Sequence, residues 1–391
     1  MLETEDVART TFICVAGARP NFMKIAPLME QLRRHPTVRT VLVHTGQHYD
    51  RAMSHLFFEQ LQIPTPDINL EVGSAPAATQ LATIIERFDR VLVDEAPALV
   101  IVVGDVTSTL ACTLAAVIRG IPVAHVEAGL RSFDRTMPEE VNRVLTDAVS
   151  DFLFTTERSA ADNLLREGID RAKIHFVGNV MIDTLMAHRR KAEESDVLRR
   201  LGVAPHSYAL VTLHRPSNVD HCPNLRGILS ALHTISQDMP VLFPAHPRTR
   251  SRIEAFGLGH YVLPPNGDRA SAGINLYEPF GYLEFLKLTA NASIVLTDSG
   301  GIQEETTVLG TPCLTLRENT ERPVTIDQGT NILTGVSPAR ILEAWAAAMT
   351  QSRSERRIPE LWDGHAAERI VETLIERFAR SERPTCYETA S

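Results

Sequence analysis

The sequence predicts an α/β protein built from two doubly wound parallel-sheet domains. Short apolar runs rich in β-branched residues alternate with longer amphipathic segments, which is the pattern of βαβ units. The chain has 391 residues, more than one hydrophobic core usually fills. The alternation stops at a charged segment, residues 181–200, and then starts again. We therefore expect one Rossmann-like domain over residues 10–180 and a second over residues 181–363.

The expected strands fall into two sets of five. Each strand of the first half is followed by helical periodicity: Thr11–Ala16, Val38–His44, Leu99–Val103, Val123–Val126 and Phe152–Thr156. The second half gives five more strands: Tyr208–Leu213, Val241–Pro244, Tyr261–Leu263, Ile294–Thr297 and Cys313–Leu316. A last helix is expected over about residues 364–380. It is a candidate to pack back on the first domain, although the sequence does not place it.

The amino-acid composition limits which partners the protein can bind and where in the cell it is expected. The formal net charge of -9 argues against general nucleic-acid binding, but a few local arginines can still hold a small anionic ligand. No apolar run approaches membrane-spanning length, so no membrane partner is expected. The five cysteines form no CxxC pair, which indicates reduced thiols rather than disulfides. We expect a cytoplasmic protein.

An anion-binding turn is the most informative local feature. The apolar run ending at Thr297 leads into Asp298, Ser299, Gly300 and Gly301 and then directly into a helical pattern. Glycines let the backbone approach an anion, and the amides and positive dipole of the helix N-terminus favour phosphate. A well-capped turn without a ligand is the alternative interpretation.

Other polar residues follow the remaining strands, where ligands bind in open parallel sheets. These segments share one position, directly after a strand: residues 17–24, 45–50, 104–109, 125–131, 213–215 and 245–248. Arg317 and Arg322 follow the last strand. His48 and His246 lack the spacing of a metal pair, so no metal is expected.

Eight motifs occur in order along the chain: GARPNFMKIAPL, TGQHYD, GDVTSTLA, HVEAGLRSFDRTMPEEVNR, His214-Arg215, HPRTR, TDSGGIQEE and TERP. Together they resemble the non-hydrolysing UDP-N-acetylglucosamine 2-epimerases. The resemblance implies a GT-B-like fold with the active site in the cleft between two Rossmann-like domains. It also implies interconversion of UDP-GlcNAc and UDP-ManNAc without an added cofactor, by a homodimer.

Inversion at C2 needs carboxylates near that carbon and cations on the diphosphate. By resemblance, Asp105, Glu127 and Glu139 are the acid/base candidates, and Arg143 and His214 belong to the catalytic region. A helix cap or a buried ion pair is the alternative role for each carboxylate.

The resemblance also implies a set of substrate-binding residues. Arg19, Lys24, His214 and Arg322 match diphosphate and active-site contacts, although solvated surface charge is the usual fate of such residues. Ser299 and Gly300 are expected to donate to the phosphates, and Glu305 to take the ribose hydroxyls. Glu304 is expected to project elsewhere and to be structural. Phe280 is placed near the uracil, with a core role as the alternative.

Pro216 departs from the family pattern. Many bacterial members carry a second arginine there, which together with the glutamine and histidine of the TGQH turn resembles part of an allosteric UDP-GlcNAc site. Proline has no charge, so the sequence argues against allosteric activation. Three other functions stay open: epimerisation of a UDP-2,3-diacetamido-2,3-dideoxyuronic acid, hydrolysis to ManNAc and UDP, and a GT-B glycosyltransferase or nucleotide-sugar-binding protein.

Overall fold

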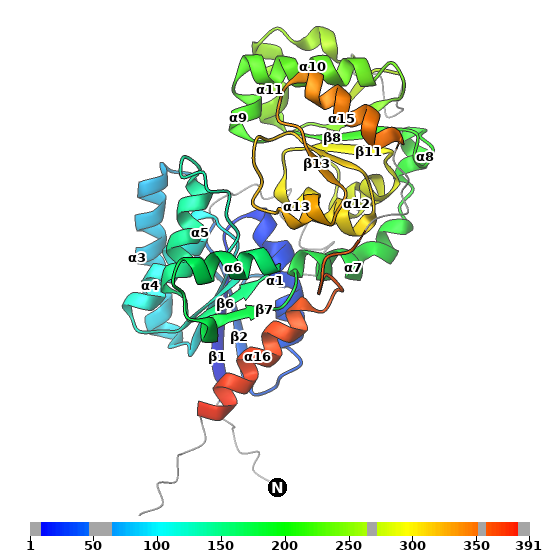
Figure 1. Cartoon of the computed structure of the whole chain (residues 1–391). Helices are drawn as coiled ribbons and strands as arrows, with labels where there is room; N and C mark the ends of the chain where they lie inside the picture. The colour runs from blue at the N-terminus through cyan, green and yellow to red at the C-terminus, as the bar shows by residue number, and fades with distance from the viewer. Residues whose placement is uncertain (1–8, 47–64, 264–271, 351–356, 382–391) are drawn as a thin grey trace, which may run out of the picture.

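The computed structural model describes residues 9–46, 65–263, 272–350 and 357–381. Two lobes, each with its own parallel sheet and flanking helices, lie one above the other in Figure 1. We call them the N-terminal lobe and the C-terminal lobe. The predicted fold class, two Rossmann-like doubly wound sheets, is therefore confirmed.

The N-terminal lobe contains a seven-stranded sheet in the order β3-β2-β1-β4-β5-β6-β7. Its strands are β1 (Thr10–Ala16), β2 (Val38–His44), β3 (Ile68–Asn69), β4 (Leu99–Val103), β5 (Val123–Ala128), β6 (Phe152–Thr155) and β7 (Ile174–Phe176). Its helices are α1 (Arg19–Leu32), α3 (Ala77–Glu95), α4 (Thr107–Ile118), α5 (Pro138–Val149), α6 (Arg158–Arg166) and the short η1 (Arg171–Lys173). Successive residues of β1 enter opposite cores, Phe12 on one face and Ile13 on the other. Burial on both faces explains why these strands are continuously apolar.

The C-terminal lobe contains a six-stranded sheet in the order β10-β9-β8-β11-β12-β13. Its strands are β8 (Ala209–Thr212), β9 (Val241–Pro244), β10 (Ile274–Tyr277), β11 (Ile294–Thr297), β12 (Cys313–Thr315) and β13 (Asn331–Leu333). Its helices are α8 (Val197–Leu201), α9 (Pro216–Val219), α10 (Cys222–Ile235), α11 (Pro247–Ala255), η2 (Gly259–Tyr261), α12 (Tyr282–Asn291), α13 (Gly300–Leu309), α14 (Val324–Asp327) and α15 (Pro338–Thr350).

One predicted strand is wrong. Residues 261–263 follow the 3-10 turn η2, and Val262 forms only an isolated bridge to Ile274. The strand at that edge of the sheet is β10, which pairs with β9 along its whole length. A run of three apolar residues is too short for its own pattern to separate a strand from a turn. Other short strands, β3, β7 and β13, were not predicted for the same reason.

Helix α7 joins the two lobes, and the final helix packs on the N-terminal one. The charged segment predicted near residue 181 is largely helical as α7 (Val180–Glu193), which contacts both α1 and α12. The final helix, α16 (Ala366–Ser381), lies against α1, and its Phe378 ring is 5.0 Å from that of Phe12. Figure 1 shows α16 beside the N-terminal lobe. Asp183 of α7 caps α16 by accepting hydrogen bonds from the N–H groups of Ala366 (3.1 Å) and Ala367 (2.6 Å).

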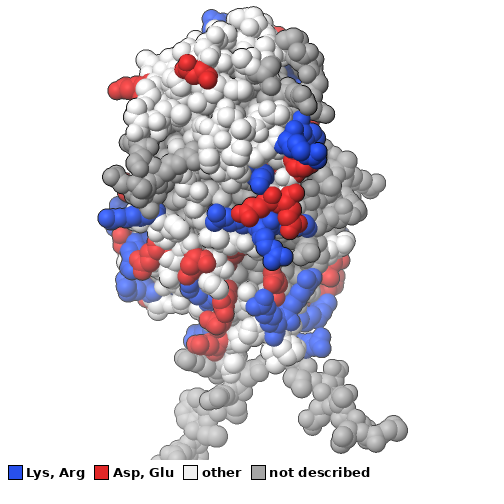
Figure 2. All heavy atoms as spheres, turned by 90° about the vertical axis from the view of Figure 1, so that its right-hand side faces the viewer, with Lys and Arg blue, Asp and Glu red and all other residues white. Residues whose placement is uncertain are grey.

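The surface mixes charges of both signs. On the face shown in Figure 2, Lys and Arg side chains are interspersed with Asp and Glu. Arg200 of α8 and Glu284 of α12 illustrate such a pairing, at 2.6 Å. Among the described residues, no helix combines the length and apolar character needed to cross a membrane.

We expect Asp183→Ala to destabilise the protein by about 1 kcal/mol, because two amides at the start of α16 lose their acceptor inside the protein. Thermal unfolding followed by circular dichroism would measure the loss. Asp196→Ala is the matched control, since Asp196 precedes α8 without a side-chain capping bond. Equal melting temperatures for the two variants would contradict the role of Asp183.

Candidate active site

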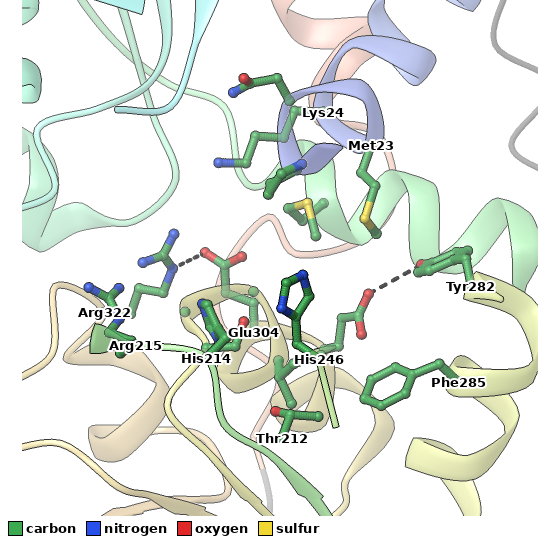
Figure 3. A pocket seen from close by; sticks show the side chains of 18 of the residues that line it. Met23, Lys24, Thr212, His214, Arg215, His246, Tyr282, Phe285, Glu304 and Arg322 are labelled. Carbon is green, nitrogen blue, oxygen red and sulfur yellow. Dashed lines mark hydrogen bonds and ion pairs between the residues drawn. The ribbon is translucent and has the colours of Figure 1, made fainter. Parts of the chain in front are cut away.

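A cavity of about 470 Å³ lies where the two lobes meet. Its walls come from the N-terminal end of α1 and the turns after β4, β8, β9 and β11, so the carboxyl ends of strands from both sheets face it. In Figure 3, Lys24 and Met23 approach from the N-terminal lobe, and His214, Arg215 and Glu304 approach from the C-terminal lobe. This is the edge of each sheet at which ligands bind in doubly wound folds.

The β11–α13 turn forms part of the C-terminal wall. Ser299 is the N-cap residue of α13, yet its side chain makes no capping hydrogen bond. Gly300 follows as the first helical residue, and a Cβ there would lie 2.5 Å from Nη1 of Arg322. Any other residue here would therefore displace the Arg322 guanidinium from its ion pairs. The turn presents backbone amides and a hydroxyl to the cavity, as phosphate binding needs.

Arg322 is the most highly connected cation of the cavity. It is buried and forms ion pairs with Glu304, with Glu321 and, at 2.7 Å, with Glu127 of the N-terminal lobe. Although burial lowers the pKa of a guanidinium, these carboxylates hold the pKa of Arg322 well above its usual range. Glu321 also pairs with Arg317 at 2.8 Å. The arginine therefore carries its full charge while it bridges the lobes.

Lys24 reaches the same centre from the other side. Asn21 fixes the start of α1 by accepting from the Ala18 N–H at 2.9 Å and donating to the Val103 carbonyl at 3.1 Å. One turn later, the Lys24 ammonium forms an ion pair with Glu127. Glu127 stands at an irregular point of β5 with φ of 74°. A left-handed conformation costs a non-glycine residue about 1–2 kcal/mol and is typical of functional positions.

Asp105 and Glu139 are presented by a turn and a helix that hold each other. Asn142 of α5 donates to the Asp105 carbonyl at 2.9 Å, and Arg143 of the same helix pairs with the Asp105 carboxylate. Burial raises the pKa of Asp105, but Arg143 and Lys24 outweigh it, so the pKa lies below its ordinary value. The helix-cap alternative is wrong for Asp105, because Val106 is the N-cap of α4. Glu139 is in the first turn of α5 and lines the cavity.

His214 is oriented by a buried carboxylate. Its Nδ1 lies 2.8 Å from Asp298, and Asp298 also accepts from the backbone N–H groups of His214 and Arg215. Burial raises the pKa of Asp298, but the interactions with His214 and the backbone N–H groups of His214 and Arg215 together outweigh burial, and the pKa is lowered. An ionised Asp298 therefore fixes the imidazole at the cavity mouth.

Glu304 and Glu305 are both buried, and both line the cavity. Their side chains diverge: Glu304 turns to Arg322, and Glu305 accepts a hydrogen bond from the Tyr282 hydroxyl at 3.2 Å. The prediction that Glu304 projects away from the site is wrong, because the helix is covered on both sides. Burial raises the pKa of Glu305 to about 8. Phe280 lines the cavity and also packs on a core cluster.

The cavity brings together nine of the twelve predicted site residues. They are Lys24, Asp105, Glu139, His214, Phe280, Ser299, Gly300, Glu305 and Arg322. Glu127 and Arg143 stand behind this lining as ion partners. Arg19 is the first residue of α1, but its side chain lies outside the described part of the structure. Gln47 and His48 of the TGQH turn also lie outside it, and Pro216 begins α9.

Three residues of the site lie outside the set predicted from the sequence: Tyr282, Asp298 and Glu321. Each acts through a partner, on Glu305, His214 and Arg322 respectively. Asp298 and Glu321 could have been predicted, because each is a polar residue directly before a predicted site residue, Ser299 and Arg322 respectively. No local pattern distinguishes Tyr282 from a core tyrosine.

A two-lobed GT-B-like fold with a phosphate-type turn and paired carboxylates at the lobe junction defines a nucleotide-sugar enzyme. A family model described as UDP-N-acetylglucosamine 2-epimerase matches residues 30–375. The chain belongs to this isomerase family, as its motifs had indicated.

Individual relatives cover almost the whole chain. The UDP-N-acetylglucosamine 2-epimerase of Methanocaldococcus jannaschii is 40% identical over 92% of this chain and 97% of its own. A crystal structure of that enzyme in complex with UDP-GlcNAc and UDP superimposes with a TM-score of 0.86, over 94% of this chain and 100% of the other. A UDP-2,3-diacetamido-2,3-dideoxy-D-glucuronate 2-epimerase of Pseudomonas aeruginosa is 39% identical over 93% of this chain and 99% of its own.

Glu157 provides a test of the electrostatics behind the site. It follows β6, is buried, and has Oε2 without a hydrogen-bond partner among the described residues. Burial raises its pKa to about 7, although the hydroxyl of Ser159 lowers it. Because the folded pKa exceeds the unfolded one, the contribution of Glu157 to stability is present at low pH and is lost as pH rises through 7.

We therefore expect Glu157→Gln to raise the melting temperature relative to wild type at about pH 8 and to have little effect at about pH 5. Scanning calorimetry at the two pH values measures the difference. Glu254→Gln, which removes the same charge from an exposed position, is the control. A Glu157→Gln effect that does not depend on pH would rule out the buried, titrating carboxyl.

Proposed function

We propose that this protein interconverts UDP-GlcNAc and UDP-ManNAc by inverting C2 of the sugar. The observation that carries the proposal is the meeting of two carboxylates, Asp105 and Glu139, with two cations, Lys24 and Arg322, in one cavity. The phosphate-type turn at Ser299 and Gly300 belongs to the C-terminal wall, as Arg322 does, whereas Asp105 and Glu139 belong to the N-terminal wall. The relatives named as UDP-N-acetylglucosamine 2-epimerases support the choice of sugar.

The reaction begins with elimination. C2 of the sugar is not adjacent to a carbonyl, so direct removal of its proton is unfavourable. A carboxylate takes the C2 proton while the C1–oxygen bond breaks and its electron pair leaves with UDP. The products are a 2-acetamidoglucal and UDP. Lys24 and Arg322 stabilise the negative charge that grows on the diphosphate, and the amides at Ser299 and Gly300 add hydrogen bonds.

Re-addition completes the inversion. UDP attacks C1 of the glycal, and a carboxylic acid delivers a proton to C2 from the opposite face. Asp105, Glu127 and Glu139 are the three candidates for these proton transfers, with Arg143 holding Asp105 and His214 beside the diphosphate. Two faces require two proton-transfer groups, and a cavity with carboxylates on the N-terminal wall meets that requirement.

A UDP-2,3-diacetamido-2,3-dideoxyuronic acid is the second candidate substrate. The Pseudomonas aeruginosa relative favours it at almost the same identity as the first relative. The carboxylate of such a sugar needs an additional basic group, and Arg215 and His246 line the cavity besides the predicted cations. The cytoplasmic location stays a prediction from composition. The resemblance further implies the homodimer and a role in surface-polysaccharide synthesis, and both stay predictions.

Proton NMR in deuterated water tests the proposal directly. Protein mixed with UDP-GlcNAc alone is expected to form UDP-ManNAc with deuterium at C2, because the proton exchanges with solvent during elimination. A parallel reaction uses the diacetamidouronic acid nucleotide. Free ManNAc and UDP would indicate hydrolysis. Turnover of only the uronic acid nucleotide would make it the substrate in place of UDP-GlcNAc. Turnover of neither compound would refute epimerisation.

We expect Asp105→Asn, Glu127→Gln and Glu139→Gln to lower turnover by about two powers of ten, the usual size for a lost acid/base group. UDP binding is retained in all three. It becomes tighter in Glu127→Gln, because Lys24 and Arg322 lose a carboxylate that competes with the diphosphate for them. Steady-state kinetics and calorimetry with UDP measure the two effects.

Glu167→Gln is the control for the change in net charge, since Glu167 pairs with Arg131 rather than with a lining cation. Near-normal turnover in all three carboxylate variants would show that these residues do not carry out the proton transfers. Weaker UDP binding in Glu127→Gln would show that Glu127 does not compete with the nucleotide.

A further inference from the structure

A buried tyrosine and a buried glutamate meet at the C-terminal wall of the cavity. Tyr282, the first residue of α12, is 5% exposed, and its hydroxyl donates to Oε1 of Glu305. Glu305 lies in the second turn of α13 and is 1% exposed. Both residues line the cavity, and a dashed line at Tyr282 in Figure 3 marks this hydrogen bond. The glutamate is therefore held at one oxygen on the surface that a ligand contacts.

The other oxygen of this carboxylate is unsatisfied. Oε2 of Glu305 is buried and has no hydrogen-bond partner among the described residues. Leaving a buried acceptor unpaired is unfavourable, and more so for a charged group. A ligand that brings hydroxyl donors to this position removes the cost. Two neighbouring hydroxyls on one sugar ring are the donor pair that suits one carboxylate.

The distance from the phosphate turn fits a nucleotide ribose. Glu305 is five residues beyond Gly300 on the same helix, which is about 7 Å along the helix axis. A ribose follows its diphosphate at a comparable spacing. A diphosphate at the Ser299–Gly300 turn thus brings the ribose hydroxyls towards Glu305, in keeping with the proposed function.

Tyr282 is itself fixed from the other side. Its ring lies edge-on to His188 of α7 at 6.0 Å, and it belongs to the core that contains residues of α1 and α7. His188 in turn contacts the Thr184 carbonyl through Nδ1 at 2.8 Å. A side chain with so little freedom can define the direction of the group it binds.

From this geometry we infer that Tyr282 is a positioning residue, which holds Oε1 of Glu305 so that the carboxylate accepts the ribose hydroxyls. It thereby sets a preference for ribonucleotides over 2′-deoxyribonucleotides. The inference rests on the proposed function, because it assumes that a uridine nucleotide occupies the cavity. Tyr282 does not take part in the proton transfers at C2.

The Tyr282 hydroxyl also favours the ionised form of Glu305, because its hydrogen bond lowers the pKa of this buried carboxyl. Burial raises the pKa of Glu305 to about 8, and the hydrogen bond from Tyr282 opposes that rise. An ionised carboxylate accepts both ribose hydroxyls, whereas a protonated one retains a donor of its own. Loss of the tyrosine hydroxyl therefore weakens the acceptor as well as its orientation.

Calorimetric binding of UDP and 2′-deoxy-UDP to the full chain tests the inference. Wild type is expected to prefer UDP by about tenfold, as for one hydrogen bond to a charged group. Tyr282→Phe should lose most of this preference. Tyr208→Phe is the matched control, because Tyr208 is another buried tyrosine of the same lobe, whose hydroxyl donates to the Leu288 carbonyl at 2.7 Å outside the cavity. It should lower stability and leave the preference intact.

The variant Glu305→Gln tests the same contact from the other side. Glu305→Gln should reduce the preference as well, and the double variant Tyr282→Phe/Glu305→Gln should add little to either single change, since both act through one contact. An unchanged preference in a folded Tyr282→Phe variant would overturn the positioning role. Wild type that catalyses epimerisation but binds UDP and 2′-deoxy-UDP equally would also overturn the positioning role. Absence of both UDP binding and epimerisation would instead refute the proposed function.

Discussion

The ion pairs around Arg322 are the constraint on which the rest of the site depends. Burying a guanidinium between two lobes is unfavourable unless its N–H groups pair with carboxylates. Glu304 and Glu321 meet it from the C-terminal lobe, and Glu127 meets it from the N-terminal lobe. The position of Arg322 thereby links the β5 turn to the β11–α13 turn. Gly300 follows from the same constraint, because a side chain there would occupy the space of the arginine.

The parallel sheets decide which residues can join this network. All strands of a parallel sheet end at one edge, so each lobe offers a row of turns to the other. The N-terminal lobe contributes carboxylates held by their own lobe, as Asp105 is held by Arg143. The C-terminal lobe contributes the phosphate-type turn and a histidine held by Asp298. In the proposed function the acid/base candidates thus come from the N-terminal wall, whereas the diphosphate is held from both walls, by Lys24 on one side and by Arg322 and the turn on the other.

Charge balance explains how a protein of net charge -9 can hold an anionic nucleotide. Lys24 and Arg322 both form ion pairs with Glu127, so under the proposed function a diphosphate competes with this carboxylate for both cations. In that proposal, binding of the nucleotide is coupled to the release of Glu127, one of the three proton-transfer candidates. Pairing of this kind also keeps the cations oriented before the nucleotide arrives, which lowers the ordering cost of binding.

The sequence by itself determined the fold class, the family and most strands, because apolar runs and turn residues are local patterns and eight motifs occur in order. It also indicated Asp105, Ser299 and Arg322, which stand directly after strands or in motifs. Tertiary structure alone decided that Glu304 faces the cavity, that Tyr282 binds Glu305, and that residues 261–263 do not form a strand. Glu127 and Arg322 are 195 residues apart in the chain, and no local pattern encodes their contact. The physical reason is common to all of these: burial and ion pairing between distant segments depend on how the lobes pack, whereas propensity and turn chemistry depend only on neighbours in the chain.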